Sequence, residues 1–148
     1  MKKFERTAEF VTNVSGKKLF RIKALVAFGV VEKGELGGFI EKEDNLSHDG
    51  NAWVTGNAML TGNARVTGNA DYAVVKGFGR YFRTTTFFRC KDKILRVQCG
   101  CFYGDLAQFR EIVKKTHGNS KYAKEYLAIS DLMELHFSDE EEKQEAAK

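Results

Sequence analysis

Residues 50–73 read GNAWVT GNAMLT GNARVT GNADYA, four copies of one six-residue pattern. Each copy begins with Gly-Asn-Ala, and its fifth residue is large: Val54, Leu60, Val66 and Tyr72. Gly and Asn accept the positive φ of a tight corner, and a small and a large residue at fixed positions can fill the inside of a coil. The pattern predicts a short left-handed β-helix over residues 45–76, in which each repeat forms one flat side of a triangular prism.

A run of short β-hairpins is the alternative interpretation of the repeat. Two-residue hairpin turns favour Asn-Gly, whereas this chain has Gly-Asn, and the spacing of six is shorter than the roughly 8–12 residues typical of all-β folds. Three sides complete one turn of the prism, so four repeats form little more than one turn. Because roughly three or more stacked units are needed to bury a continuous core, we expect the ends to be covered by flanking segments, by another subunit, or by both. The expected assembly is a homo-oligomer, either a dimer or a trimer.

An N-terminal β cap is expected over residues 1–44. Residues 19–26 alternate in polarity, with Phe20, Ile22 and Ala24 on one face, and Ser15-Gly16 ahead of them is a turn signal. The pattern indicates a β-hairpin with one buried face.

An α+β module is expected over residues 77–137. Residues 80–89 and 94–99 have the composition of strands, and a turn at residues 91–93 would join them into a second hairpin. Asp105 can cap a helix that Gly118 ends, and Asn119 or Ser120 can cap a second helix to about residue 135. The predicted fold class is therefore α+β, mainly β, with the second hairpin packed by two C-terminal helices. Residues 138–148 are expected to form an acidic tail.

The formal net charge of +4 is unevenly distributed along the 148 residues. Residues 138–148 have five acidic residues and two lysines, a net charge of −3, whereas residues 76–98 have seven basic residues and one acidic residue, a net charge of +6. A transmembrane helix needs about 18 consecutive apolar residues, and no run in this chain is nearly that long. No apolar signal segment follows Met1. Three cysteines without secretory features are expected to be reduced thiols. These features predict a soluble protein of the cytoplasm with no membrane partner.

The basic segment is the first candidate binding site. Aromatic side chains, among them Tyr81 and Phe82, interrupt its charges. Basic groups bind phosphate and aromatic rings stack on bases, so the segment could hold a small anionic ligand, a nucleic acid or an acidic protein surface. Strand alternation offers another explanation, with the aromatic residues in the core and the basic groups in water. The basic residues concerned are Arg80, Arg83, Arg89, Lys91, Lys93 and Arg96.

Three single residues are further candidates. Trp53 would be a contact residue if it lies on an outer face, but the N-terminal hairpin could also cover it. His117 lies between the two predicted helices, where it could help to bind an anion or could simply end the first helix. His48, which Asp49 follows, could act as a general base or could be a corner residue at the start of the coil.

The cysteines raise the possibility of a metal site. Cys90, Cys99, Cys101 and His117 have the number of ligands of a Cys₃His zinc site. Structural zinc sites space their cysteines by about two to four residues, whereas one residue separates Cys99 from Cys101. In a strand both would point to the same face, which suits core residues under the helices. We therefore expect no metal, and the sequence indicates no cofactor.

The repeat resembles the hexapeptide-repeat β-helices of bacterial acyltransferases and their catalytically silent relatives. Residues 36–40 (LGGFI) and 45–54 (NLSHDGNAWV) are similar to the start of β-helix proteins found in bacteria, prophages and phages. Residues 97–104 (VQCGCFYG) and the following positions to Tyr126 are similar to the C-terminal module of such phage-encoded proteins. The resemblance implies a fold and a phage or prophage setting.

Three functions remain open at this point. The first is a non-enzymatic phage or prophage binding protein, an antagonist of host defence that occludes a host protein or sequesters a small anionic ligand. The alternative is an acyltransferase-like enzyme with His48 as its base, although the acyltransferases have a longer β-helix and project a loop that this repeat lacks. A further alternative is a nucleic-acid-binding protein that uses the basic hairpin.

Overall fold

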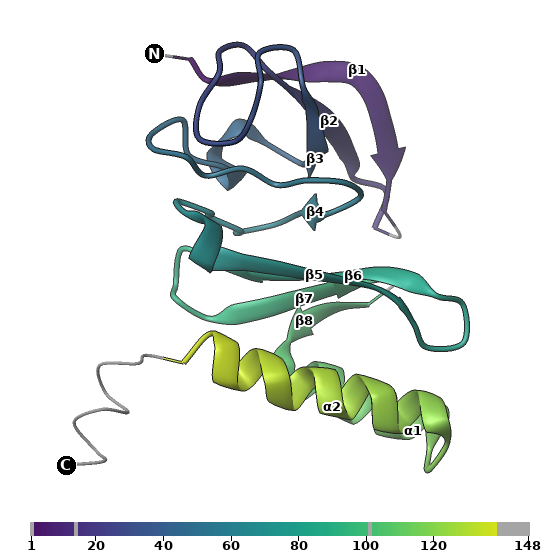
Figure 1. The fold of residues 1–148 in the computed structure, drawn as a ribbon. Coiled ribbons are helices and arrows are strands. Elements are labelled where there is room, and N and C mark those ends of the chain that lie inside the picture. Colours follow the sequence, from purple (N-terminus) through teal and green to yellow (C-terminus); the bar gives the residue numbers. More distant parts are fainter. Residues whose placement is uncertain (1, 14, 101, 139–148) are drawn as a thin grey trace, which may run out of the picture.

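The computed structural model describes residues 2–13, 15–100 and 102–138, which form three stacked layers (Figure 1). The first layer has the strand order β1 (Phe4–Thr12), β2 (Lys18–Ala24), β3 (Leu36–Ile40) and β4 (Met59–Leu60). The middle layer is a sheet of β5 (Tyr72–Phe78), β6 (Arg83–Arg89), β7 (Leu95–Cys99) and β8 (Phe102–Asp105). Helices α1 (Leu106–His117) and α2 (Lys121–His136) form the third layer. The predicted class, α+β and mainly β, is confirmed. The acidic tail beyond Ser138 lies outside the described residues.

The N-terminal hairpin is present as predicted. Strands β1 and β2 pair antiparallel from Phe4↔Ala24 to Thr12↔Lys18. Ile22 and Ala24 are buried, whereas Phe20 is only half-buried. The hairpin therefore presents one apolar face to the rest of the first layer.

The first three repeats form a coil with parallel contacts. Residues twenty positions apart lie side by side, as β3 and β4 do at Ile40↔Leu60 and as the isolated bridge Leu46↔Val66 does. The predicted interior is confirmed for these repeats, because six residues are fully buried: Ala52, Val54, Ala58, Leu60, Ala64 and Val66. The corner glycines Gly50, Gly56 and Gly62 have φ of 63°, 59° and 60°, values that side-chain-bearing residues rarely adopt.

The fourth repeat departs from the pattern, so that part of the prediction is wrong. Gly68 is extended, with φ −160° and ψ 169°, and precedes the 3₁₀ turn η2 (Asn69–Asp71). Ala70 is exposed, and Tyr72 begins β5. The physical reason is pairing: from Tyr72 the backbone forms an antiparallel ladder with β6 instead of continuing the coil.

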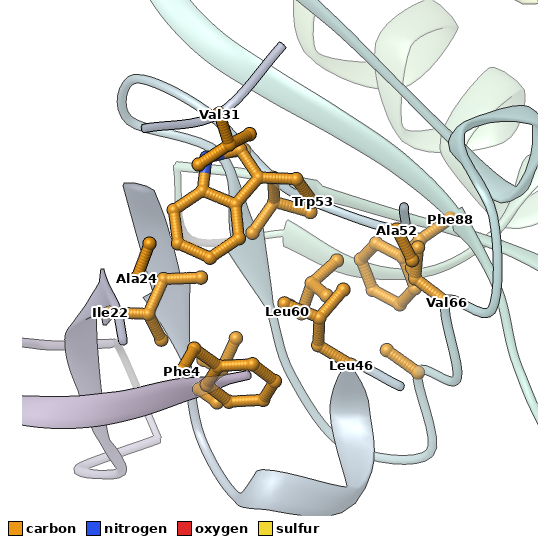
Figure 2. Packing of buried hydrophobic residues seen from close by; sticks show 14 of the residues in the cluster. Phe4, Ile22, Ala24, Val31, Leu46, Ala52, Trp53, Leu60, Val66 and Phe88 are labelled. Carbon is orange, nitrogen blue, oxygen red and sulfur yellow. The ribbon is translucent and has the colours of Figure 1, made fainter. Parts of the chain in front are cut away.

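The interior of the coil is closed at both ends from within the chain. Phe4 and Ile22 of the hairpin cover one end, and Phe88 of β6 covers the other (Figure 2). Cys90 belongs to the same cluster. All four are almost fully buried in one cluster with the coil residues. The flanking segments thus supply the cover that the sequence required, and the open coil no longer argues for a second subunit. The dimer or trimer stays a prediction.

The second sheet uses both of its faces. The predicted hairpin is β6–β7, to which β5 and β8 add one antiparallel strand on each side. Because successive strand residues point to opposite faces, Phe88 packs against the coil while Phe87 packs against the helices. The sheet is therefore buried between the first layer and the helices.

The two helices begin and end at the predicted residues. The Asp105 side chain accepts a hydrogen bond from Gln108 N, and the Ser120 side chain accepts one from Ala123 N. Phe109 and Tyr126 form the helical side of the second core. Within the described residues, no helix is both long and apolar enough to cross a membrane.

Asn45 links successive turns of the coil. Its side chain is fully buried. Its Nδ2 donates to Gly62 O at 3.1 Å and to Ala64 O at 2.9 Å. Its Oδ1 accepts from Glu41 N at 3.2 Å and from Lys42 N at 3.0 Å. One amide thus satisfies four backbone groups on two turns of the chain.

We expect Asn45→Ala to lower the free energy of unfolding by about 2–4 kcal/mol, because it leaves buried backbone groups without partners. Urea unfolding followed by circular dichroism measures this difference. Asn63→Ala is the matched control, since Asn63 follows a corner glycine but its side chain is exposed; its effect should stay within about 0.5 kcal/mol. Equal effects of the two substitutions would contradict the role given to Asn45.

Candidate functional site

The six basic residues of the predicted site lie at two ends of the second sheet. Arg83 begins β6 and Arg89 ends it. At about 3.3 Å per residue, these two residues are about 20 Å apart along the strand. Arg80 therefore lies near Arg83 at the end with the β5–β6 turn, while Lys91, Lys93 and Arg96 lie near the opposite end.

Arg96 is paired within its own hairpin. Its two terminal nitrogens donate to the two carboxylate oxygens of Asp92, each at 2.9 Å. This contact is the largest cause of a raised pKa for Arg96 and of a lowered pKa for Asp92. A guanidinium held by both oxygens of a carboxylate is not free for a ligand.

Arg89 and Lys91 also have partners in the chain. Arg89 donates to Phe137 O at 2.8 Å, which ties the end of α2 to the sheet. Lys91 forms an ion pair with Asp44. Lys93 is exposed in the β6–β7 turn with φ 70°. At this end the positive charge mainly holds parts of the fold together.

The other end of the sheet contains a cavity of about 190 Å³ between the second sheet and the two helices. It brings together three of the residues that the sequence singled out, Arg80, Arg83 and His117. The polar and aromatic side chains of its wall are Arg80, Tyr81, Arg83, Cys99, Phe102, Phe109, Thr116, His117 and Tyr126. Figure 1 shows the β5–β6 turn and the α1–α2 connection at the same end of the molecule. We take this cavity as the candidate functional site.

The inner wall of the cavity is aromatic and apolar. Phe109 of α1 meets the ring of Tyr126 edge to face, with ring centres 5.6 Å apart and planes at 83°. The ring centre of Phe102 lies 5.4 Å from that of Phe109, with the two planes at 52°. Ile112 and Val113 extend the apolar wall along α1. Such a wall suits a flat ring or another apolar group.

Two guanidinium groups lie close to the Tyr81 ring at the mouth of the cavity. Their central carbons lie 5.7 Å (Arg80) and 5.2 Å (Arg83) from the centre of the Tyr81 ring. Arg83 also lies over Gly100, where an added Cβ would come within 2.6 Å of its Nη1. Within the described part of the chain, neither arginine forms an ion pair. Their positive charges are therefore available to an anion.

Tyr126 and Cys99 form a polar edge deeper in the cavity. The Tyr126 hydroxyl donates to Phe78 O at 3.2 Å, and the Cys99 thiol lies 3.9 Å from it. Burial, and then the neighbouring Cys99, raises the pKa of Tyr126 to about 12. Tyr126 is therefore protonated and neutral at physiological pH. Arg80 and Arg83 are the cavity residues that carry a permanent positive charge.

His117, in the last turn of α1, completes one wall. Its ring lies over that of Tyr126, with centres 6.1 Å apart and planes at 27°. The sequence offered two roles for His117, a helix end and an anion contact, and its position is compatible with both. Gly118 follows with φ 57° and ends the helix.

The β5–β6 turn is held against α2. Gly79 N donates to Glu125 Oε1 at 3.2 Å, next to the contact of Tyr126 with Phe78. The turn carries two strongly exposed aromatic residues, Tyr81 at 66% and Phe82 at 67%. Phe82 has φ 52°, a conformation that is uncommon outside glycine. These contacts fix Arg80 and Arg83 at the mouth of the cavity.

His48 does not lie in this cavity and is not arranged as a general base. Its Nδ1 accepts a hydrogen bond from Lys3 N at 3.0 Å, and its ring stacks on Phe4 at 4.0 Å and 10°. Because Nδ1 is the acceptor, the neutral ring carries its proton on Nε2, which lies 3.9 Å from Glu43 Oε2. The Nδ1 lone pair, which a general base would use to accept a proton, is therefore occupied by the hydrogen bond from Lys3 N. His48 fits its alternative role as a corner residue at the start of the coil.

Trp53 is buried, so its proposed role as an exposed contact residue is corrected. Only 3% of its surface is exposed, and Phe28 meets it edge to face at 5.4 Å. The segment between β2 and β3, which contributes Phe28 and Val31, covers the ring (Figure 2). The tryptophan lies in the first core because the N-terminal cap packs over that side of the coil.

The cysteines lie on opposite faces of the second sheet. Cys90 packs in the first core and Cys99 in the second, so these two residues do not face a common metal. Burial raises the pKa of the Cys90 thiol. Cys101 lies outside the described residues. Among the residues that are described, no three His, Cys, Asp or Glu side chains are grouped to hold a metal ion.

Sequence reasoning did not assign Tyr126, Phe109 and Phe102 to the site. Tyr126 lies on the apolar stripe of α2, and Phe109 lies on that of α1. The same stripe pattern describes residues that fill a core and residues that line a cavity beside it. No signal in the sequence separates the two.

The close approach of Gly79 to Tyr126 gives a stability prediction. A Cβ at Gly79 would overlap the Tyr126 ring, and φ at Gly79 is +78°. Gly79→Ala should lower the free energy of unfolding by about 1–2 kcal/mol for its backbone and by about 1–3 kcal/mol more for the overlap. Gly77→Ala is the control, since Gly77 has φ +96° and open space. Urea unfolding should show a smaller loss for Gly77→Ala, and equal losses would refute the contact.

The environment of His48 predicts a pH dependence of stability. Burial lowers the pKa of His48 below 6.5 in the folded protein. As the pH falls below 6.5, His48 takes up a proton in the unfolded chain before it does so in the folded protein. The free energy of unfolding therefore decreases from about pH 6.5 down to the folded pKa. His48→Asn keeps a neutral acceptor and should show a flatter decline between pH 7.5 and pH 5 in urea unfolding. An identical decline in both proteins would show that His48 contributes nothing to it.

Comparison of the chain with protein-family models, with curated proteins and with solved structures gave no match. Two guanidinium groups without ion pairs among the described residues, an aromatic wall and a position at the end of a buried sheet make this cavity the candidate binding site.

Proposed function

We propose that the protein is a non-enzymatic binding protein that sequesters a small anionic ligand in the cavity at the end of the second sheet. The observation that carries the proposal is the position of Arg80 and Arg83, without ion pairs among the described residues, close to Tyr81 at the mouth of an aromatic cavity. An arginine at the surface of an apolar cavity attracts phosphate or carboxylate.

The shape of the cavity supports a ligand with both an anionic group and a flat ring. The ring would lie against the wall formed by Phe102, Phe109 and Tyr126, and the anionic group would remain at the arginines. A nucleotide combines the two groups in this way. The guanidinium planes and the exposed face of Tyr81 provide further stacking area.

The position of His48 supports a binding protein over the acyltransferase alternative. An acyltransferase needs a base that removes a proton from its acceptor, and the lone pair of His48 is occupied by Lys3 N. The pairing of Arg89, Lys91 and Arg96 within the chain supports a small ligand over nucleic acid, because an extended strand requires a continuous basic track.

The biological setting is the part of the proposal that rests on the sequence resemblance. A phage or prophage protein that binds a small anionic ligand in the host cytoplasm could remove a signal on which an antiviral defence depends. Occlusion of a host protein is the other form of the same hypothesis, with the exposed Tyr81 and Phe82 as contacts.

The proposal includes a left-handed turn for the coil. The parallel pairs twenty residues apart and the three corner glycines of positive φ support a triangular β-helix of little more than one turn. In this proposal the coil is a scaffold that positions the second sheet, and the ligand binds at the end of that sheet.

Titration calorimetry with adenosine 5′-monophosphate tests the proposal. The wild-type protein should bind it, and adenosine, which lacks the phosphate, should bind at least ten-fold more weakly. Arg83→Gln should lower the affinity for the monophosphate by about ten-fold or more, because hydrogen bonds to charged groups contribute about 1.5–3 kcal/mol. Lys93→Gln is the control, since it removes an exposed positive charge at the other end of the sheet.

Equal binding of adenosine and its monophosphate, or an unchanged affinity of Arg83→Gln, would contradict the proposal. Binding of a single-stranded oligonucleotide that falls steeply with salt and is weakened equally by Arg83→Gln and Lys93→Gln would favour the nucleic-acid alternative instead.

A further inference from the structure

Arg83 borders a second hollow besides the cavity. A groove of about 480 Å³ lies between the first layer and the second sheet. Its walls include Arg21, Phe39 and Met59 from the first layer, and Thr84, Thr86 and Gln98 from the second sheet. Arg83 contributes to the groove and also to the cavity. One guanidinium group therefore stands between two spaces.

The two spaces lie on opposite faces of the second sheet. Alternation along β6 directs Thr84 and Thr86 towards the first layer and Thr85 and Phe87 towards the helices. The Thr86 hydroxyl accepts a hydrogen bond from Met59 N at 3.1 Å, which confirms its direction. Arg83 lies at the end of β6, where the sheet no longer separates its two faces, so its long side chain can border both.

The cavity by itself is small for a ligand site. Sites for drug-sized ligands have volumes of about 300–1,000 Å³, and the cavity has about 190 Å³. The cavity can enclose a single ring with few substituents. The groove on the other side of Arg83, with about 480 Å³, falls within the usual range.

The groove is polar but has little free charge. The Arg21 Nε donates to Glu9 Oε2 at 2.8 Å, and its Nη1 donates to Gly37 O at 2.7 Å. The Gln98 Nε2 donates to Gly100 O at 2.9 Å, which leaves its Oε1 as an acceptor. Hydroxyl and amide groups of this kind suit sugar hydroxyls and base edges better than a second phosphate. The anionic part of the ligand is thereby assigned to Arg80 and Arg83.

We infer that the ligand is a dinucleotide with one phosphodiester, which binds at Arg83 with one base in the cavity and the second nucleoside in the groove. This inference rests on the proposed function and specifies its ligand. A ligand of this kind has a ring system on each side of a single charge. The aromatic cavity, Arg83 and the polar groove are arranged in the same order.

The experiment compares adenylyl-(3′→5′)-adenosine, which has one phosphodiester, with adenosine 5′-monophosphate by titration calorimetry. The dinucleotide should bind the wild-type protein at least ten-fold more tightly. Thr84→Tyr should fill the groove from β6 and reduce the affinity for the dinucleotide to that for the monophosphate, whose own affinity should not change. Arg83→Gln should weaken both ligands.

Asn57→Trp should block the same groove from its opposite wall, and it serves as a second variant in case Thr84→Tyr does not fold. Asn57 is exposed at a corner of the coil, so the substitution should leave the fold intact. If the monophosphate binds through Arg83 but the dinucleotide binds no more tightly, the inference fails and the proposed function stands. If neither nucleotide binds, both fail.

Discussion

A coil with little more than one turn would by itself leave its apolar interior exposed at both ends. The rest of this fold depends on covering those two ends. The hairpin closes one end with Phe4 and Ile22, and β6 closes the other with Phe88. Burying apolar surface at about 25 cal/mol per Å² favours both closures, and neither the hairpin nor the second sheet has another partner for that face. Asn45 links the turns between them through backbone carbonyls that would otherwise be buried without partners.

The closure determines which parts of the second sheet stay accessible. One face of the second sheet covers the coil and the other carries the two helices, so both faces of its centre are buried. The ends of the sheet remain. At one end, contacts of Arg89, Arg96 and Lys91 with other parts of the chain hold the fold together. At the other end, the β5–β6 turn is fixed to α2, and Arg80 and Arg83 form no ion pair with any residue that the structure describes. Positive charge and an apolar cavity meet at this end.

The separation of the basic residues shows what a charge count leaves out. Residues 76–98 have a net charge of +6, yet the arginines divide between two ends about 20 Å apart because a strand lies between them. Arg83 and Arg96 are the same residue type in neighbouring strands, and they differ in whether a carboxylate is within reach. The Asp92 that neutralises Arg96 lies four residues away in the turn, whereas the neighbours of Arg83 are Tyr81, Gly100 and the cavity.

Local patterns in the sequence were sufficient for the class of fold, the buried positions of the first three repeats, the N-terminal hairpin and the capped helices. Each of these depends on residues close together in the chain, such as the alternation around Ile22 or the cap at Asp105. The end of the coil at Gly68, the burial of Trp53 and the meeting of Arg80, Arg83 and His117 were decided by the tertiary structure. The reason is that these features depend on the pairing of β5 with β6 and on the packing of whole layers. They bring together residues that are far apart in the chain, such as Tyr72 and Phe88 or Arg80 and His117. The six-residue period of the repeat does not indicate which other segments of the chain will cover it.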